Sequence, residues 1–227
     1  MNLNPTANVP FAVHAESPRA SRELASALVT ALWEAKKDEH AGLIVVCIGT
    51  DRSTGDALGP LVGSILAGAV GLPALVYGTL DQPVHATNLQ QVIQHLQNES
   101  PGSLVIAVDA CLGAPENVGH IVVARGALRP GAGVNKNLPP VGDVHVTGVV
   151  NVSGFMEYFV LQNTRLGPVM RMARTIAAGI ALAARTWEMP HVEAVTAAAG
   201  PGPGQYRQVS GLPPELPEPW FPHPASP

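Results

Sequence analysis

The stretch GLIVVCIGTDRSTGDALGP, residues 42–60, decides the fold. It begins with a run of apolar, mostly β-branched residues that closes at Gly49, and a short polar loop follows. A run of this length and composition is typical of a strand buried on both faces of a parallel sheet. The apolar segment after the loop predicts a helix over residues 56–70. A strand, a glycine-containing loop and a helix in this order form the opening unit of an α/β fold.

The same alternation extends in both directions from this stretch. Before it, Leu24, Leu28 and Leu32 lie at helical spacing and predict an amphipathic helix over residues 21–39. After it we expect strands at 74–80, 103–110, 120–128 and 144–150, and helices at 85–97, 155–165 and 168–187. Alternating strands and helices predict a three-layer αβα fold with a central, mostly parallel sheet.

The 227 residues divide into three expected parts. Residues 1–16 form an N-terminal extension, residues 17–189 form one α/β domain, and residues 190–227 form a tail rich in Pro and Gly. The tail lacks hydrophobic periodicity, so we expect it to be extended or disordered. The Gly- and Pro-rich segment at residues 129–143 is expected to be an ordered loop within the domain.

Composition excludes several classes of partner. Hydrophobic residues make up 46% of the chain, charged residues 13%, and the formal net charge is −4. No cluster of Lys and Arg is present, so we expect no nucleic-acid partner. No stretch approaches the ~18 uncharged apolar residues of a membrane span, and no secretory signal is recognisable, so we expect a cytoplasmic protein without a membrane partner. Cys47 and Cys111 are expected to be buried thiols in a reducing compartment.

Asp56 is the first candidate for chemistry. It follows the strand that ends at Gly49 and opens the predicted helix, where free backbone N–H groups and the helix dipole stabilise a carboxylate. The same position suits a purely structural helix cap, and the two interpretations remain open. Asp51 lies in the same loop. The loop lacks the Gly-Lys-Ser/Thr ending of a phosphate-binding P-loop.

Asp109 is the second candidate, at the carboxyl end of the apolar strand VIAVDA. A carboxylate there is costly to bury unless it is paired, hydrogen-bonded or functional. Ligand sites of open parallel sheets lie at the carboxyl ends of the strands, so Asp56 and Asp109 are expected to face a common cleft. A carboxylate pair can hold its pKa values apart and activate a water. The alternative is that Asp109 stabilises a loop.

Other polar residues follow strand ends and are weaker candidates. Asp81 and His85 lie after the strand at 74–80, and His85 is a candidate general base or a helix cap. Asn151 and Ser153 lie at a loop-to-helix junction and could bind a peptide backbone. Cys111 is an alternative nucleophile if His85 or His145 lies beside it.

The motifs carry a family resemblance. The segments CIGTDRSTGDALGP, YGTLDQPVHATNL, VIAVDACLG, GVNKNLPPVGD and VTGVVNVSGFMEYFVLQNTRL resemble, in this order, the YyaC-type sporulation protein family. They extend over most of residues 43–182, and TGDALGP with VDACLG is the specific combination. The same two segments resemble, more distantly, the germination protease of spore formers and the hydrogenase maturation endopeptidases.

The resemblance implies a peptidase-like α/β domain and a role for both aspartates. Matched motif by motif, Asp56 and Asp109 correspond to the catalytic pair of the germination protease. In the hydrogenase peptidases these positions bind nickel together with a histidine from a later loop. Here Ser153 stands where that histidine is expected, and His145 lies in a predicted strand. We therefore expect no cofactor; a divalent metal, if one binds, would use Asp56 and Asp109.

The leading hypothesis is an endopeptidase of sporulation or spore germination, acting on a protein or peptide in the cytoplasm of the sporulating cell or forespore. Two alternatives stay open. One is a peptide- or protein-binding module of the sporulation programme without turnover. The other is a metal-dependent small-molecule hydrolase that would use Asp56, Asp109 and a histidine. Because related folds associate, a homo-oligomer is also open.

Overall fold

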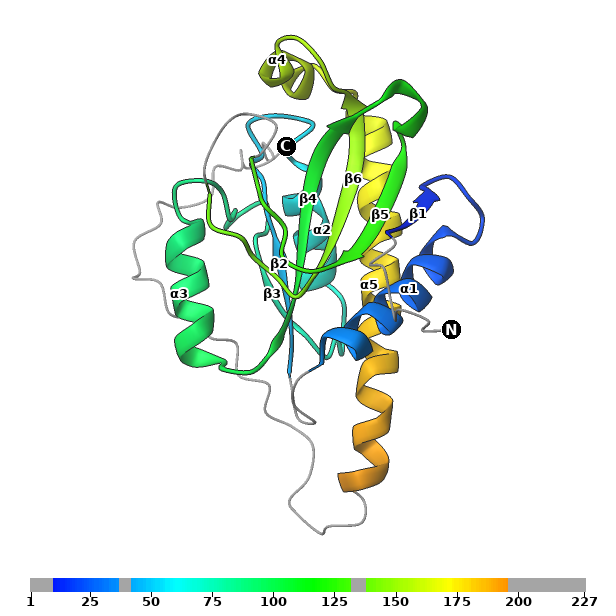
Figure 1. Ribbon diagram of the computed structural model, residues 1–227, viewed down its shortest axis with the longest axis vertical. Helices are drawn as coiled ribbons and strands as arrows, with labels where there is room; N and C mark the ends of the chain where they lie inside the picture. Colours follow the sequence, from blue (N-terminus) through cyan, green and yellow to red (C-terminus); the bar gives the residue numbers. More distant parts are fainter. Residues whose placement is uncertain (1–9, 37–41, 132–137, 196–227) are drawn as a thin grey trace, which may run out of the picture.

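The fold is built on one six-stranded sheet with the strand order β1-β5-β6-β4-β2-β3 (Figure 1). The structure, a computed structural model, describes residues 10–36, 42–131 and 138–195. The strands are β1 (Phe11–His14), β2 (Leu43–Cys47), β3 (Leu75–Tyr77), β4 (Leu104–Gly113), β5 (His120–Arg125) and β6 (Val144–Val152). β3, β2, β4 and β6 run parallel, whereas β5 and β1 pair antiparallel at one edge. The predicted mostly parallel sheet is confirmed.

Helices cover the two faces of the sheet unequally. The large core joins one face to α1 (Ala20–Ala35), α2 (Leu58–Ala67) and α5 (Leu166–Val195). The small core joins the other face to α3 (Leu89–Glu99). Figure 1 shows this three-layer arrangement, with α4 (Glu157–Gln162) beyond the end of β6. The short helix η1 (Pro115–Asn117) links β4 to β5.

The burial of individual residues follows the sequence pattern. Leu24, Leu28 and Leu32 on α1 are all fully buried, as their spacing predicts, and each such burial contributes about 1.5–3 kcal/mol. All five residues of β2 are buried, which confirms a strand covered on both faces. Cys47 is buried and Cys111 partly buried, and burial raises the pKa of both thiols.

The alternation of β4 places Asp109 on the thinly covered face. Ile106 and Val108 belong to the large core, whereas Ala107 between them belongs to the small core beside α3. Successive side chains of a strand point to opposite faces, so Asp109 lies on the same face as Ala107. Besides α3, the described parts of the β5–β6 connection cover this face through Leu128 and Val141, so Asp109 lies in a largely desolvated position.

Several element bounds differ from those expected. β1 lies within the predicted N-terminal extension and pairs with β5; only Val13 of its four residues is buried, so it leaves no periodic signal. α5 continues to Val195, past the expected domain end at residue 189. α3 begins at Leu89 because Asn88 holds a turn, accepting from the N–H of His85 and donating to the carbonyl of Pro83. The predicted tail beyond 195 and part of the 129–143 loop lie outside the described residues.

Among the described helices, none combines the length and the apolar character that a membrane crossing requires.

Candidate functional site at the carboxyl edge of the sheet

The loop after β2 folds back onto the end of its own strand. The N–H of Gly49 donates to Val84 O (2.8 Å), and the N–H of Thr50 donates to Asp56 O (3.2 Å). Gly49 has a φ of 149°, and a Cβ there would collide with the carbonyl oxygen of Asp56. The loop therefore needs glycine at position 49, because the close backbone approach is what positions Asp56.

Asp56 does not open a helix as expected. α2 begins at Leu58, its N-cap is Ala57, and no side chain caps it. Asp56 lies in the turn before the cap, where the N–H of Ala57 donates to Ser53 O (2.9 Å). Because the loop folds back onto the strand end at Gly49, α2 begins two residues later than the sequence pattern predicted. The carboxylate is half-buried at the carboxyl edge of the sheet.

Asp109 is held in an unfavourable environment for a charge. It lies on β4 between the parallel strands β2 and β6, and its carboxyl oxygen accepts one hydrogen bond, from the N–H of Ala110 (2.8 Å). Burial raises the pKa of Asp109 to about 8; the bond from Ala110 opposes this rise, and the nearby Asp56 carboxylate adds to it. Asp109 is therefore mostly protonated at neutral pH.

The structure brings the two aspartates together. Burial is the main cause of the raised pKa of Asp109, and the charge of Asp56 is a smaller contribution, so the two carboxyl groups are near enough to influence each other. A proton held on Asp109 leaves Asp56 to carry the negative charge of the pair. This arrangement supplies a proton donor and a proton acceptor side by side, which is the requirement for acid–base chemistry at one substrate atom.

Ser53 is a further potential hydrogen-bond acceptor in the loop before Asp56, and its burial is not predictable from the sequence. Its side chain is buried, and its Oγ has no hydrogen-bond partner among the described residues. A buried hydroxyl without a partner costs about 1–3 kcal/mol. A water or a substrate group bound in the loop would supply that partner. No sequence pattern distinguishes this serine from an exposed loop serine.

The loop that carries Asp56 is fixed to α4. The N–H of Gly55 donates to Leu161 O (2.9 Å). A Cβ on Gly55 would lie 2.7 Å from Leu161 Cδ2 and 3.1 Å from Leu161 Cα, so only glycine permits this contact without movement. Gly55 and Leu161, 106 positions apart, are thereby joined at the residue next to Asp56, a contact that no local sequence signal indicates.

The weaker candidates near these loops make local contacts. His85 lies at the same edge, since Val84 pairs with Ile48 at the end of β2. The His85 ring Nδ1 lies 2.9 Å from Thr87 Oγ1, within its own turn. Asp51 and Asp81 are exposed, and neither contributes to the raised pKa of Asp109. None of these three residues has a described contact with Asp56 or Asp109.

His145 and Cys111 do not form a nucleophilic pair. His145 lies on β6 opposite Ala107, four strand positions before the residue that faces Cys111, a separation of roughly 13 Å along the strand. The Nδ1 of His145 donates to Gly126 O (2.8 Å), because a carbonyl can only accept. Burial raises the pKa of the Cys111 thiol against a hydrogen bond from Thr147, which disfavours a thiolate nucleophile.

Asn151 and Ser153 fix the start of the α4 segment. The amide of Asn151 donates to Thr164 Oγ1 (3.1 Å), and its Oδ1 accepts from the N–H of Val152 (2.9 Å). Ser153 is exposed, and its N–H donates to Gly113 O (2.8 Å) at the end of β4. The Asn151 side chain is occupied within the fold, whereas the Ser153 hydroxyl remains accessible.

The residues at this edge do not make a complete metal site. Within the described ranges no three His, Cys, Asp or Glu side chains are grouped so that they could hold an ion. The Nδ1 of His145 is directed to Gly126 O, and Ser153 offers only a hydroxyl group. Asp56 and Asp109 alone, one of them mostly protonated, form a poor ligand set for a divalent metal.

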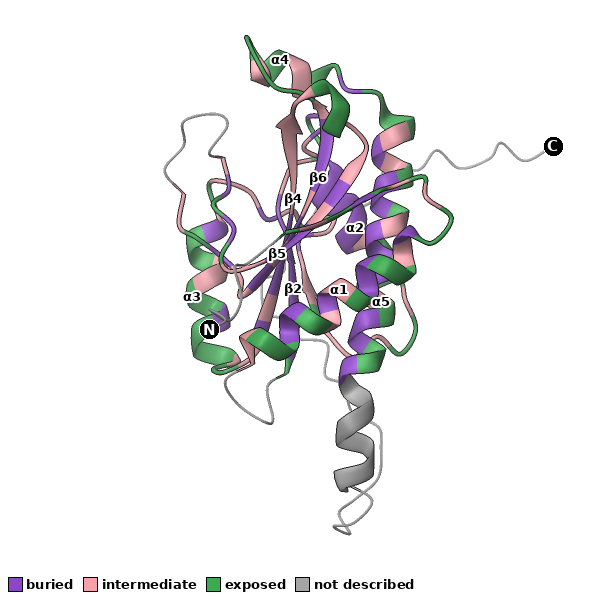
Figure 2. Ribbon diagram, turned by 45° about the vertical axis from the view of Figure 1, so that its right-hand side comes forward, coloured by how far each residue is buried: buried purple, intermediate pink, exposed green. Residues whose placement is uncertain are grey.

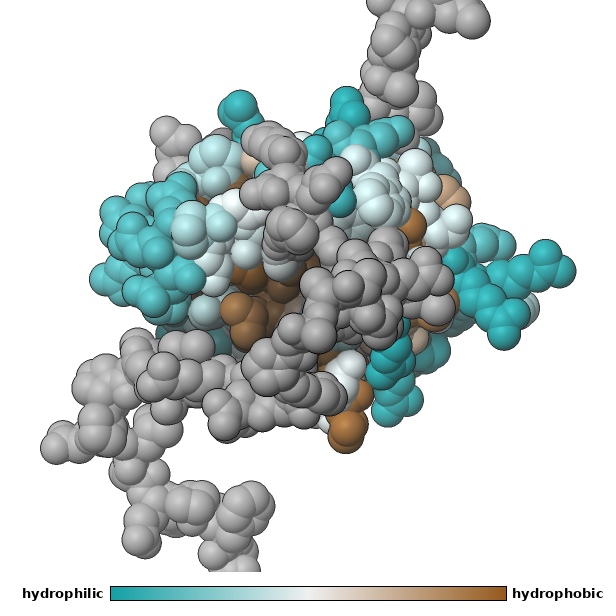
Figure 3. Space-filling view, turned by 90° about the horizontal axis from the view of Figure 1, so that it is seen from below, coloured by the Kyte–Doolittle hydropathy of each residue, from teal (hydrophilic) through white to brown (hydrophobic). Residues whose placement is uncertain are grey.

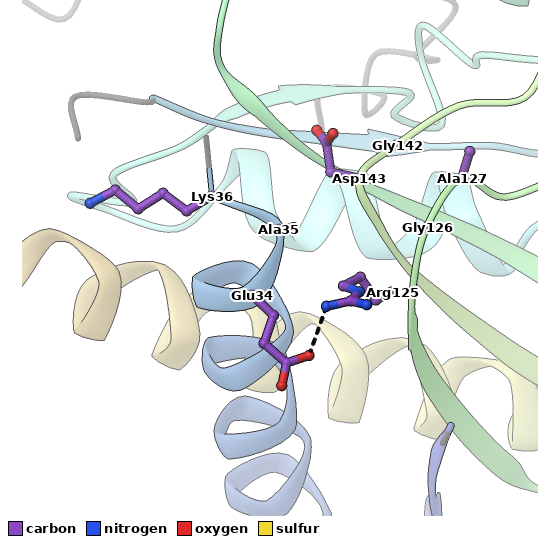
Figure 4. Close-up of a pocket in the computed structure, with 8 residues that line it drawn as sticks. All are labelled: Glu34, Ala35, Lys36, Arg125, Gly126, Ala127, Gly142 and Asp143. Carbon is purple, nitrogen blue, oxygen red and sulfur yellow. Dashed lines mark hydrogen bonds and ion pairs between the residues drawn. The ribbon is translucent and has the colours of Figure 1, made fainter. Parts of the chain in front are cut away.

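Two hollows elsewhere on the described surface are not lined by either aspartate. The larger, about 530 Å³ and widely open, lies at the amino end of β6 between Glu34, Arg125 and Asp143 (Figure 4). Figure 4 shows the Glu34–Arg125 ion pair across it (3.3 Å), with Asp143 pointing away from Arg125. The smaller, about 210 Å³, lies between the β4–β5 connection and the start of α5. The smaller hollow is lined by His14, Glu16 and Arg171, and Arg171 forms an ion pair with Glu16 (3.1 Å).

Comparisons with known proteins identify relatives. A family described as "Protein of unknown function (DUF1256)" matches residues 12–179. The uncharacterized protein YyaC of Bacillus subtilis (strain 168) is 52% identical over 167 residues, which are 74% of this chain and 80% of that protein. The match begins within β1, at the sheet edge that was expected to be an extension. The expected likeness to YyaC-type proteins is confirmed.

Among solved structures, a crystal structure of a NiFe hydrogenase maturation protease, HycI from Thermococcus kodakarensis KOD1, is similar to this chain. The TM-score is 0.47 at 17% sequence identity, over 70% of this chain and 98% of that chain.

Proposed function

The chain belongs to the DUF1256 family, and from the chemistry of its carboxyl edge we propose that it is an endopeptidase that hydrolyses a peptide bond with Asp56 and Asp109. One observation carries the proposal. Burial raises the pKa of Asp109 to about 8 and the nearby Asp56 carboxylate adds to the rise, so a state with one protonated and one ionised aspartate is favoured at neutral pH. Aspartate pairs in this state catalyse peptide hydrolysis without a resident metal. The resemblance of TGDALGP and VDACLG to germination protease motifs supports the same assignment.

The two carboxyl groups take different roles. Asp56, as carboxylate, accepts a proton from the attacking water, whose oxygen adds to the scissile carbonyl carbon. Asp109, as acid, donates a hydrogen bond to the carbonyl oxygen and stabilises the charge that develops there. The C–N bond then breaks, and the proton taken by Asp56 passes to the leaving amine. Water is consumed, and a new carboxylate and a new amino terminus are formed.

The substrate we propose is a protein of the sporulating cell. This part of the proposal rests on the resemblance of the motifs to YyaC-type sporulation proteins and to the germination protease of spore formers. An apolar α/β domain with a net charge of −4 and no basic cluster favours a polypeptide over a nucleic acid as partner.

The test compares newly formed peptide N-termini. Lysate of sporulating Bacillus subtilis that lacks its own YyaC would be incubated with the wild-type chain and with the Asp56→Asn, Asp109→Asn double variant, with and without divalent metals. We expect new termini only with the wild type, and they would identify the substrate. Equal sets of termini from both proteins, with both folded, would reject the peptidase.

A binding module without turnover is the second candidate, and the exposed apolar residues around α4 favour it. Phe155, Tyr158 and Phe159 are 91%, 59% and 55% exposed. If the double variant and the wild type capture the same polypeptide and neither cleaves it, this function replaces the peptidase.

A further inference from the structure

The segment around α4 exposes apolar side chains next to the aspartate pair. We call these residues the α4 patch: Val152, Phe155, Met156, Tyr158, Phe159 and Leu166, each between 38% and 91% exposed. The chain has only ten aromatic residues of the Phe, Tyr and Trp types, and three of them lie within five positions here. Figure 2 shows α4 beyond the sheet edge, coloured as exposed or intermediate. Such clustering in a chain poor in aromatic residues marks a surface that binds something.

The backbone of the patch is strained. Met156 has a φ of 59°, the left-handed conformation, and it is the one residue other than glycine with a positive φ in the described part of the chain. A left-handed conformation at such a residue is unfavourable and is retained mainly where it serves function. Met156 is the N-cap of α4, and Phe155 just before it is 91% exposed.

The patch is also fixed to the proposed catalytic loop. Leu161, at the last turn of α4, accepts the hydrogen bond from Gly55, the residue before Asp56. At the other end, Asn151 and Ser153 tie the segment to Thr164 and to Gly113 of β4. The patch therefore holds a set position relative to both aspartates.

We propose that the α4 patch binds an extended segment of the substrate polypeptide that carries aromatic or large aliphatic side chains close to the scissile bond. This inference rests on the proposed peptidase function. Two carboxyl groups and a narrow loop offer little surface to a polypeptide, so binding must come from neighbouring side chains. The patch lies beside the pair, whereas the hollows at Arg125 and at Arg171 do not include it.

The size of the patch favours a peptide over a second copy of this chain. A stable protein–protein interface takes about 20–30 residues from each side. The α4 patch offers six exposed apolar side chains, which suits a short extended peptide that presents a few anchor residues.

The experiment separates binding from cleavage. A random library of 12-residue peptides would be passed over the immobilised full chain with Asp56→Asn and Asp109→Asn, and the retained peptides sequenced by mass spectrometry. We expect aromatic and large aliphatic residues to be enriched at least threefold over the input. Adding Phe155→Ser, Tyr158→Ser and Phe159→Ser should abolish that enrichment, while Val70→Ser, at a 94% exposed valine elsewhere, should keep it.

Each outcome decides the inference independently of the peptidase. No enrichment on the parent protein, or equal enrichment after the three α4 substitutions, would overturn it. A dimer that sedimentation detects and that the α4 substitutions dissociate would also overturn it, because a second copy would then occupy the patch. In the cleavage assay the α4 triple variant with intact aspartates should raise KM at least tenfold and leave the pH profile unchanged. Enrichment without any cleavage by the wild type would reject the peptidase and keep the patch.

Discussion

Charged side chains lie in opposite environments at the two ends of the sheet, in water at one end and desolvated at the other. At the amino edge, charged side chains stay in water and pair across an open hollow, as Glu34 and Arg125 do. Figure 3 views this end and shows mainly hydrophilic and neutral residues around its rim. At the carboxyl edge, Asp109 is desolvated beside a second carboxylate, the buried Ser53 hydroxyl has no described partner, and aromatic residues are exposed.

The difference shows where function is expected. Trp33 is 45% exposed at the amino edge and the buried Trp187 Nε1 beside it has no described partner, so exposed aromatic residues and unpaired buried atoms occur at both ends. Among the described residues, the carboxyl edge differs in holding a desolvated carboxyl group that a second carboxylate influences. Departures from local consistency concentrate at functional sites because their cost is accepted only where chemistry or binding requires it. The contrast therefore supports the carboxyl edge as the working site, and each of the following changes tests one side of it.

The largest expected effect is on cleavage. Asp56→Asn or Asp109→Asn should each lower the rate of new N-terminus formation by about 10²-fold or more, because acid–base catalysis by one group contributes that much. The matched change at the amino edge, Arg125→Gln, should leave the rate within about twofold of wild type. Equal losses of cleavage rate from the substitutions at the two edges would show that the assay reports on folding and not on catalysis. Circular dichroism is therefore measured for each variant.

Gly55→Ala should destabilise the fold and separate α4 from the Asp56 loop. The new Cβ meets Leu161 Cδ2 at 2.7 Å and Leu161 Cα at 3.1 Å, and overpacking of this kind costs about 1–3 kcal/mol. Urea unfolding measures the loss. The control is Gly68→Ala at the end of α2, where the nearest atom is 3.6 Å away and φ is −80°, so its free energy of unfolding should not fall. If Gly55→Ala is as harmless as the control, the loop is not held by α4.

The pH dependence of stability should differ between wild type and Asp109→Asn. Between the unfolded pKa near ~3.9 and the folded pKa of about 8, folded Asp109 holds a proton that the unfolded chain has released. This contribution to stability is present in full at low pH and declines as pH rises to about 8. The variant should therefore gain stability relative to wild type over that range, by at most ~1.4 kcal/mol per pH unit, and the gain should level off above it. Parallel pH curves for the two proteins would show that Asp109 is ionised in the folded state.

The smallest effect is expected at the exposed ion pair of the amino edge. Glu34→Gln should change the free energy of unfolding by less than about 1 kcal/mol, because water and salt screen a pair with both partners exposed. Thermal unfolding at low and high salt measures it, and the small difference should shrink as salt is added. A larger loss of unfolding free energy that salt does not reduce would mean that this ion pair is shielded from solvent.

The sequence predicted the elements with strong periodicity and missed those held by distant contacts. The leucines of α1 and the continuous apolar run of β2 were sufficient to predict these two elements. The apolar residues of a buried helix face recur at the helical period, and a strand buried on both faces is apolar throughout. The sequence did not predict β1, because four edge-strand residues with one buried side chain give no recognisable hydrophobic alternation. The start of α2 was placed two residues early, because the turn closed by Gly49 and Asp56 depends on tertiary backbone bonds.

The sequence by itself determined the three-layer fold, the placement of Asp56 after one parallel strand and that of Asp109 on another, since parallel strands present their carboxyl ends at one edge of a sheet. Only the tertiary structure decided that the two carboxyl groups interact, that burial keeps Asp109 protonated, and that α4 is fastened to the loop through Gly55. It also decided that the Nδ1 of His145 donates a hydrogen bond to the carbonyl of Gly126. The physical reason is that hydrophobic patterning is local in sequence, whereas desolvation, charge coupling and close backbone contact arise between residues that only the folded chain brings together.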